Sequence, residues 1–297
     1  MLYMPSPIHK RLPVSVVIVN YNKATYTRLC LESMLSVRDV PGQVIAIDNG
    51  SADDTLAYLE DELPGLAEAA GVECQVIANP ANAGACTARN QGLARVSQPY
   101  IVFIDNDVAV RSADWLRILQ ETLESADDIG VVGPKLVYPF EPYAIQCAGV
   151  GISRTGRVQY RGRGAVIDAL EFNQPREAQC LISACWLMRR AVVEQVGNLD
   201  EVFNPAQFED FDLCYRARER GWRVMYEPAA VMYHYESVTT AGSQGVNYKY
   251  ITIKNGLEFK RRWQHLFEHE DGPEDAACSW AKMETRPFEM TGVPPIA

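Results

Sequence analysis

Two carboxylates separated by one residue follow a short apolar segment near the middle of the chain. Residues 100–104 form a continuous apolar run, typical of a strand buried on both faces, and lead directly into Asp105-Asn106-Asp107. Ligands of open α/β sheets bind beyond the carboxyl ends of such strands. Carboxylate oxygens suit a hard divalent cation that is shared with substrate phosphates. The position of Asp105 and Asp107 therefore predicts a site for Mg²⁺ or Mn²⁺.

The segments around this motif alternate between strand and helix patterns. Apolar runs predict strands at residues 14–19, 44–47, 74–77 and 100–104, and the intervening periodicity predicts helices at 24–35, 53–59, 85–94 and 115–123. Such alternation is typical of a largely parallel sheet covered on both faces. We therefore expect an α/β fold, a Rossmann-like mixed sheet flanked by helices.

The alternation becomes irregular in the second half of the chain. A strand is expected at residues 130–138, a long apolar run covers 180–188, a helix is expected at 208–220 and a last strand at 231–234. No linker-like stretch separates the halves, so we expect one domain over residues 1–240. Residues 241–297 should hold a helix at 248–269 and a proline-containing tail, which we expect to be disordered. The basic and aromatic residues of that helix favour docking on the domain over lying on a membrane surface.

Composition narrows the class of protein. The 297 residues are 47% hydrophobic and 22% charged, an ordinary globular balance. The net charge of −10 argues against nucleic acid as a partner. The eight cysteines form no Cys-x-x-Cys pair and are predicted to be reduced core thiols. Without a signal-peptide pattern or a run of 18 apolar residues, we expect a cytoplasmic protein, with peripheral contact at the inner face of the membrane left open.

The order of several motifs carries further information. In chain order they are Asn20-Tyr21-Asn22, Asp48-Asn49-Gly50-Ser51, Asn82-Ala83-Gly84, Ala88-Arg89-Asn90-Gln91-Gly92, Asp105-Asn106-Asp107, Trp186-Leu187-Met188-Arg189-Arg190, Leu199-Asp200-Glu201, Glu209-Asp210 and His234. Over residues 14–260 this order resembles glycosyltransferase family 2, inverting enzymes with the GT-A fold. The resemblance implies a nucleotide-sugar half at about 12–110 and an acceptor half at about 111–240.

The resemblance also implies roles for individual residues at the donor side. Asp48 would hold the edge of a uracil or thymine base, Tyr21 would flank the base, and Arg89 would lie near the base or the diphosphate. Asp107 would bind the cation, and Asp105 the ribose or the cation. The remaining donor-side candidates are Asn20, Asn22, Asn49 and Asn106. His234 would be a third metal ligand, although the residue pattern alone favours a hydrogen-bonded core histidine.

Inverting transfer needs a base for the acceptor hydroxyl. The resemblance makes Asp210 that base, with Glu209 positioning the acceptor, Trp186 on the acceptor side and Asp212 as the fallback. The alternative is structural, because carboxylates in the first turn of a helix favourably meet the positive end of its dipole.

These expectations combine into a metal-dependent hexosyl- or deoxyhexosyltransferase. It would use Mn²⁺ or Mg²⁺ and a UDP- or dTDP-sugar in preference to a GDP-sugar. The product would belong to a surface polysaccharide, a glycoconjugate or a natural product, and rhamnose is one candidate sugar. The alternatives are a non-catalytic nucleotide-sugar binding protein and a sugar-1-phosphate nucleotidyltransferase, although residues 14–23 lack the Gly-rich phosphate loop of the latter. The acceptor and the oligomeric state are not predicted.

Overall fold

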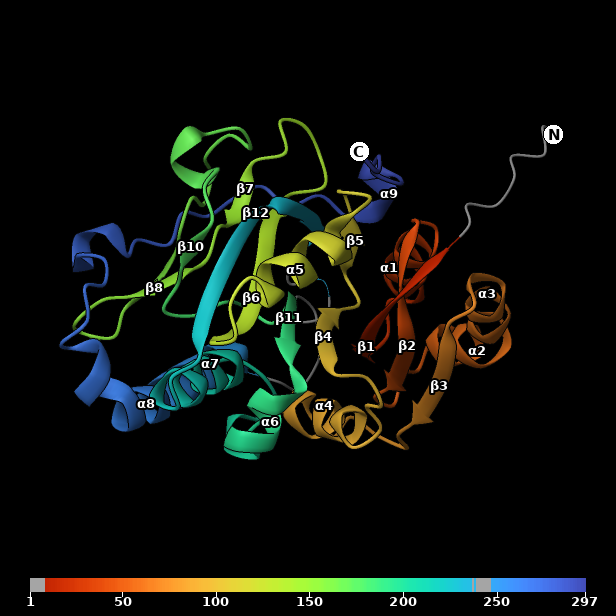
Figure 1. Cartoon of the computed structure of the whole chain (residues 1–297), viewed down its shortest axis with the longest axis horizontal. Helices are drawn as coiled ribbons and strands as arrows, with labels where there is room; N and C mark the ends of the chain where they lie inside the picture. The colour runs from red at the N-terminus through yellow and green to blue at the C-terminus, as the bar shows by residue number, and fades with distance from the viewer. Residues whose placement is uncertain (1–8, 237, 239–246) are drawn as a thin grey trace.

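A ten-stranded mixed sheet forms the centre of the molecule (Figure 1). The computed structural model describes residues 9–236, 238 and 247–297. Strands follow each other across the sheet in the order β10-β12-β6-β11-β4-β1-β2-β3, with β5 paired to β12 and β7 paired to β6. Their bounds are β1 Lys10–Asn20, β2 Asp39–Asp48, β3 Glu73–Ala78, β4 Tyr100–Asp105, β5 Val108–Val110, β6 Ile129–Val137, β7 Ile145–Cys147, β10 Arg176–Glu177, β11 Cys185–Arg189 and β12 Arg223–His234. A separate two-stranded sheet consists of β8 Val150–Ile152 and β9 Val158–Tyr160.

The first half of the chain builds the parallel part of the sheet. Strands β3, β2, β1 and β4 are parallel neighbours, so their carboxyl ends meet at one edge, as the strand and helix alternation predicts. The helices are α1 Ala24–Leu35, α2 Thr55–Asp61, α3 Leu63–Ala70, α4 Ala85–Leu93 and α5 Trp115–Glu124. The sequence analysis did not predict α3, which has a proline in its first turn and ends at Gly71, whose φ is 68°.

The second half adds antiparallel pairs to this sheet. Strand β11 runs antiparallel to both β4 and β6, which makes the sheet mixed. The long apolar run at 180–188 is only partly a strand, since β11 begins at Cys185. Before it, the backbone N–H of Ser183 donates to Asp210 and not to a neighbouring strand. The remaining helices and turns are α6 Arg190–Val196, α7 Glu209–Glu219, α8 Tyr248–Phe267, α9 Phe288–Thr291, η1 Leu170–Phe172, η2 Glu201–Phe203 and η3 Asp275–Ala277. Helices α4, α6, α7 and α8 gather along the lower side of Figure 1.

Helix α8 docks on the domain, as predicted. One stripe of the helix is buried, namely Ile251, Asn255, Phe259, Trp263 and Phe267. The ring of Phe259 packs edge-on against Tyr215 of α7, with centroids 5.3 Å apart. Burial of residues spaced four apart is typical of a helix that packs through one face. None of the helices in the described ranges is long and apolar enough to span a bilayer.

The tail after α8 is not disordered, and this part of the sequence analysis was wrong. Ala297 donates its N–H to the carbonyl of Arg111 at 2.6 Å and accepts from Ala113 at 3.0 Å. Phe288 of α9 packs on Tyr26 of α1. The tail lacks the apolar periodicity of a long helix, so its order comes from tertiary contacts that the sequence pattern does not reveal.

Candidate active site

Three residues that can ligate a cation lie together at the carboxyl edge of the sheet. Asp105 ends β4, Asp107 lies in the turn before β5, and β12 returns antiparallel to β5 to place His234 opposite Val108. Asp105, Asp107 and His234 each offer one ligand atom, and these atoms all lie within 4.8 Å of one another. This is the cluster that the sequence analysis predicted from one short motif and one distant histidine.

The orientation of His234 fits a metal ligand. Its Nδ1 lies 2.6 Å from Oε1 of Gln146, and its Nε2 lies 3.3 Å from Oδ1 of Asp107. When Nδ1 donates its proton to Gln146, the lone pair of Nε2 faces the cluster, the arrangement in which a second partner orients a ligating imidazole. Two carboxylates and one imidazole suit Mn²⁺ or Mg²⁺. The residues therefore fit the predicted cation.

The charges of the cluster are coupled. Burial raises the pKa of Asp107, but the neighbouring His234 and the backbone N–H of Val238 outweigh it, so the pKa lies below its usual range. Burial lowers the pKa of His234, and Asp107 outweighs this effect, so the net shift is upward. Asp107 and His234 therefore each favour the charged form of the other.

Arg89 links the metal motif to helix α7. Its buried guanidinium donates to Oδ1 of Asp105 at 2.6 Å and to Oε1 of Glu209 at 3.1 Å. It also donates to the hydroxyl of Ser183 at 2.7 Å and lies 5.3 Å from the ring centre of Phe103. Arg89 was predicted near the base or the diphosphate. The structure shows it fixing the two carboxylates on either side of the site.

Trp186 requires a correction. It was predicted on the acceptor side, but its side chain has no exposed surface and stacks on Phe103 at a centroid distance of 6.1 Å. A fully enclosed ring cannot contact an acceptor. Trp186 lies on the buried strand β11 and packs against Phe103, whose ring also contacts Arg89. We therefore assign Trp186 a structural role beneath the site.

The three acidic residues of the first turn of α7 differ in their surroundings. Asp210 accepts from the backbone N–H groups of Ser183 at 3.2 Å and Phe211 at 2.9 Å. Burial and the adjacent Glu209 raise the pKa of Asp210 to about 8. Burial also raises the pKa of Glu209 in spite of Arg89, and its Oε2 is a buried oxygen without a hydrogen-bond partner in the described part of the chain.

Asp212 has a structural role. It is fully buried and accepts from Arg216 at 2.8 Å, from Nε1 of Trp263 at 3.0 Å and from Arg262 at 3.2 Å. These contacts occupy both of its oxygens. Asp212 was the second choice for the general base, but neither of its oxygens is left to take a proton from an acceptor.

The donor-side candidates fall into two groups. Asp48 and Asn20 are register partners at the ends of β2 and β1, and each has a buried side-chain oxygen, Oδ1, that no described residue contacts. The other oxygen of Asp48 accepts from the N–H groups of Gly50 and Ser51, both at 3.1 Å. Unsatisfied buried acceptors are costly unless a ligand satisfies them. Asp48 and Asn20 can therefore accept from an N–H donor such as a nucleobase edge.

The remaining donor-side candidates hold loops together. Asn22 has a φ of 57° and accepts from the backbone of Ala52 at 2.8 Å. The side chain of Asn49 accepts from Asn79 and from the N–H of Ala83, both at 3.1 Å, and donates to Asn82 at 3.0 Å. Asn106 donates to Thr27 at 3.0 Å and to the carbonyl of Asn22 at 3.3 Å. Tyr21 lies beside them and is half-buried.

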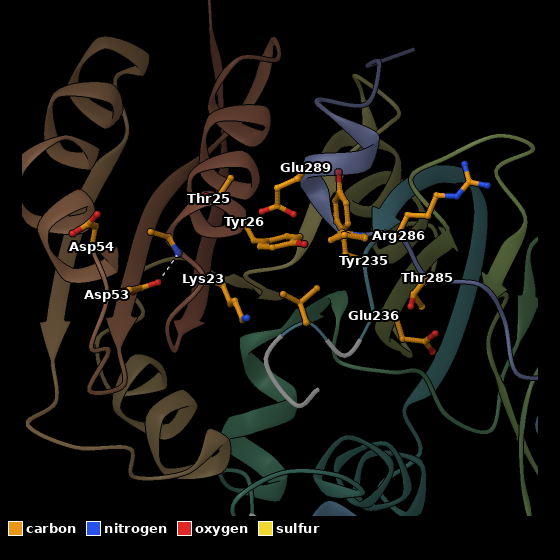
Figure 2. Close-up of a pocket in the computed structure, with 13 residues that line it drawn as sticks. Lys23, Thr25, Tyr26, Asp53, Asp54, Tyr235, Glu236, Thr285, Arg286 and Glu289 are labelled. Carbon is orange, nitrogen blue, oxygen red and sulfur yellow. Dashed lines mark hydrogen bonds between the residues drawn. The ribbon is translucent and has the colours of Figure 1, made fainter. Parts of the chain in front are cut away.

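The sequence analysis missed several participants. Ser183 and Gln146 contact Arg89 and His234, but neither lies in a motif with a recognisable spacing. A hollow of about 480 Å³ lies close to Asp107 (Figure 2). Val238 lines this hollow and donates its N–H to Asp107 at 3.4 Å. Its other walls include the start of α1 and the C-terminal tail, which was expected to be disordered.

Residues 15–197 match the family model of "Glycosyl transferase family 2". A pre-mycofactocin glycosyltransferase of Mycobacterium tuberculosis is 30% identical over 77% of this chain and 43% of its own length. An uncharacterized protein, y4gI, of Sinorhizobium fredii is 30% identical over 84% of this chain and 27% of its own length. The chain thus spans less than half of each of these relatives.

Solved structures show the same fold at low identity. GalNAc-T7 with UDP, GalNAc and Mn²⁺ has a TM-score of 0.65 at 16% identity, over 86% of this chain and 49% of that one. The mannosyltransferase PcManGT of Pyrobaculum calidifontis, in complex with GDP-Man and Mn²⁺, has a TM-score of 0.55 at 14% identity, over 90% of this chain and 73% of that one. At these identities the likeness concerns the fold alone.

Proposed function

Because the chain belongs to glycosyltransferase family 2, we propose that it moves a sugar from a nucleotide-diphosphate sugar to an acceptor hydroxyl, with inversion at the anomeric carbon. Its mixed sheet flanked by helices is the GT-A fold of its structural neighbours. The observation that carries the proposal is one edge of the sheet, where the cation cluster, the unpartnered oxygen of Asp48 and the buried Asp210 occur together. Membership of this family argues against the alternative of a sugar-1-phosphate nucleotidyltransferase.

In this proposal the donor lies along the carboxyl ends of β2, β1 and β4. Asp48 accepts from the single N–H of a uracil or thymine base, the buried Oδ1 of Asn20 lies at the next strand end, and Tyr21 flanks the base. Asp105, Asp107 and His234 hold Mn²⁺ or Mg²⁺. A cation bound there would offset the charge that develops on the leaving diphosphate. Arg89 keeps the carboxylate of Asp105 oriented through its 2.6 Å contact. A UDP- or dTDP-sugar remains the expected donor. GDP-sugars are included in the test because the structural neighbours were solved with UDP in one case and with GDP-Man in the other.

Asp210 acts as the general base in this proposal. Its carboxylate takes the proton of the acceptor hydroxyl while the hydroxyl oxygen attacks the anomeric carbon and the bond from that carbon to the diphosphate oxygen breaks. Glu209 is held by Arg89 at 3.1 Å and leaves its second oxygen to position the acceptor. The raised pKa of Asp210, about 8, suits an acid-base group working near neutral pH. The acceptor is a hydroxyl-bearing molecule, for which a glycan or lipid-linked saccharide at a membrane surface is our expectation.

A thermal-shift panel tests the donor site. The native chain, Asp107→Ala and the control Asp61→Ala, whose residue is exposed at the end of α2, are each measured with UDP-, dTDP- and GDP-sugars, with and without Mn²⁺. A ligand at 100 times its Kd adds about 2.7 kcal/mol to the free energy of unfolding. We expect one nucleotide class to raise Tm only with Mn²⁺, in the native and control chains and not in Asp107→Ala. Absence of any stabilisation in the native chain would contradict the proposal.

A further inference from the structure

The tail after α8 carries an exposed tryptophan. Trp280 is 60% exposed, whereas Trp115, Trp186 and Trp263 are buried. Figure 1 shows this tail passing the side of the molecule that holds β8 before it reaches α9. A single exposed apolar residue does not by itself indicate a binding site. The contacts of the Trp280 ring therefore decide what it can bind.

A buried arginine holds the Trp280 ring in place. The guanidinium carbon of Arg163 lies 4.0 Å from the ring centroid, and its Nε donates to the carbonyl of Ala281 at 2.9 Å. Tyr160 packs against the ring at a steep angle, with centroids 5.2 Å apart. A guanidinium attracts an aromatic face, and more strongly where the cation is desolvated. The exposed part of the ring is thereby presented in a fixed position, which lowers the entropy cost of binding.

Arg163 is in turn joined to the segment that carries His234. Its Nη1 and Nη2 donate to the two carboxylate oxygens of Glu236 at 2.9 Å and 3.0 Å. Glu236 follows His234 by two residues and also accepts from the hydroxyl of Tyr138 at 2.7 Å. Such a bidentate pair has a defined orientation. The support of the Trp280 ring therefore begins two residues from a proposed metal ligand.

The backbone around Arg163 also lies beside the strand that orients His234. Main-chain hydrogen bonds of 2.8 to 3.0 Å join residues 161–165 to residues 145–149. Gln146 belongs to this second stretch, and its Oε1 lies 2.6 Å from Nδ1 of His234. Side chain and backbone thus connect Arg163 to the same edge of the metal cluster.

Tyr160 connects the ring to the segment that holds the proposed base. Tyr160 pairs with Val150 in the sheet of β8 and β9, and Val150 forms a β-bridge with Cys180. Cys180 begins the stretch in which the N–H of Ser183 donates to Asp210 at 3.2 Å. Burial raises the pKa of Tyr160, and the nearby charge of Asp210 raises it further. Tyr160 therefore lies two strands from the segment that fixes the base.

The position of this cluster favours the acceptor over the donor. Residues 161–165 lie beside β7, which pairs with β6. Strands β11 and β4 separate β6 from β1 and β2, whose ends carry the base-binding candidates Asn20 and Asp48. A ring on the β7 side, between a metal ligand and the proposed base, is placed for the molecule whose hydroxyl is deprotonated.

The chemistry of an exposed indole suits a sugar ring. The face of a pyranose presents C–H groups with a small positive charge, and the face of an aromatic ring is negative, so the two stack. The hydroxyl groups of the sugar point outward from such a stack, and one of them is left free to react.

We propose that the acceptor is a saccharide and that one of its rings stacks on Trp280, which Arg163 and Tyr160 hold in place. This inference rests on the proposed function. Trp280 lies beyond residues 15–197, which match the family model, so this part of acceptor choice belongs to the tail of this chain.

Saturation-transfer NMR with methyl glycosides tests the inference. The methyl glycosides of glucose, galactose, mannose, rhamnose and N-acetylglucosamine are each added with Mg²⁺ and the nucleotide that stabilises the native chain. Trp280→Ala removes the ring, Trp280→Phe keeps a smaller aromatic face, and Val293→Ala, at a side chain of the same tail that is 74% exposed, is the matched control. We expect a glycoside to bind the native and control chains, about tenfold more weakly to Trp280→Ala and a few-fold more weakly to Trp280→Phe.

The tryptophan signals locate the bound sugar. The indole N–H signal of Trp280 is assigned by its absence from the spectrum of Trp280→Phe. The glycoside that binds should shift this signal and leave those of the buried Trp115 and Trp186 unchanged.

Donor binding separates a local effect from a general loss of structure. In the thermal-shift panel of nucleotide sugars, Trp280→Ala should be stabilised as much as the native chain, because the ring is separate from the donor strands. Failure of every glycoside to bind the native chain, or equal binding by Trp280→Ala, would overturn this inference and leave the proposed function standing. Failure of the native chain to bind any nucleotide sugar would overturn the proposed function, and with it the role of Trp280 toward an acceptor.

Discussion

Arg89 and Glu209 are separated by 120 positions in the chain, and their contact decides how the carboxylates of the site divide their roles. Glu209 is held by a permanent cation. Asp210, its neighbour, has only backbone N–H partners within the described residues and a pKa raised to about 8 by burial and by Glu209. One carboxylate is thereby fixed by Arg89, whereas the other can exchange a proton near neutral pH.

At this scale we predict that Asp210→Asn lowers kcat by about 10²- to 10⁴-fold, because the amide cannot accept the acceptor's proton. The donor KM should change little, since the proposed role of Asp210 concerns the acceptor. Only the ionised carboxyl acts as a base, and its pKa is raised to about 8, so kcat/KM of the native enzyme should rise with pH, reach half of its maximum near that value and level off above it. Initial rates between pH 5 and pH 9 measure this.

Glu219→Gln, at an exposed position near the end of the same helix, serves as the control and should retain native kcat. A native kcat in Asp210→Asn, or a kcat/KM that is flat across the pH range, would show that another group takes the proton.

At the scale of elements, helix α8 supports the helix that carries the catalytic candidates. Asp212 in the first turn of α7 accepts from Trp263 and Arg262 of α8, and Asn255 of α8 donates to the carbonyl of Phe203 at 2.7 Å. A buried carboxylate is tolerated only with such partners. The docking of α8 therefore helps to hold the first turn of α7 in place, and this turn carries Glu209 and Asp210.

We predict that Trp263→Phe lowers the free energy of unfolding by about 1–3 kcal/mol, because the buried carboxylate of Asp212 loses one donor while the ring volume is largely kept. Tyr250→Phe, at a position of α8 that is 64% exposed, should change it by less than about 0.5 kcal/mol. Urea denaturation of the three proteins compares them. Equal stability of Trp263→Phe and the native chain would mean that this hydrogen bond contributes nothing to the docking.

At the scale of the molecule, the sheet and α8 share one apolar core. Phe259, Trp263 and Phe267 of α8 belong to the same apolar core as the strands β1, β4 and β6. All eight cysteines are free, six of them buried. The core is therefore assembled by packing, without covalent cross-links between cysteines, as the scattered cysteines of the sequence predicted.

It follows that the thermal midpoint should be the same with and without a reductant such as dithiothreitol, because no disulfide restricts the unfolded chain. Differential scanning calorimetry of the freshly purified protein in both conditions tests this. A midpoint that falls by several degrees in the reductant would indicate a cross-link that contributes to stability.

The sequence by itself determined the local features of this protein. Apolar alternation gave the parallel strands and helices of the first half, and the order of the motifs gave the family, because periodicity and short motifs depend on neighbouring residues. It also anticipated the cluster of Asp105, Asp107 and His234 and the docking of α8. Asp105 and Asp107 were predicted from their position after an apolar strand, the docking of α8 from its basic and aromatic residues, and the place of His234 in the cluster from the family resemblance alone.

Only the tertiary structure decided which distant groups meet. Trp186 packs on Phe103 in the core, and Asp212 accepts a hydrogen bond from Trp263 of α8. Arg89 lies between Asp105 and Glu209, and the tail contacts Tyr26 through Phe288. Nothing in a local segment encodes such contacts, because they depend on how strands far apart in the chain are ordered in the sheet and which side chains that order buries. The physical reason is that a buried polar group must find its partner wherever the packing brings one within hydrogen-bonding distance.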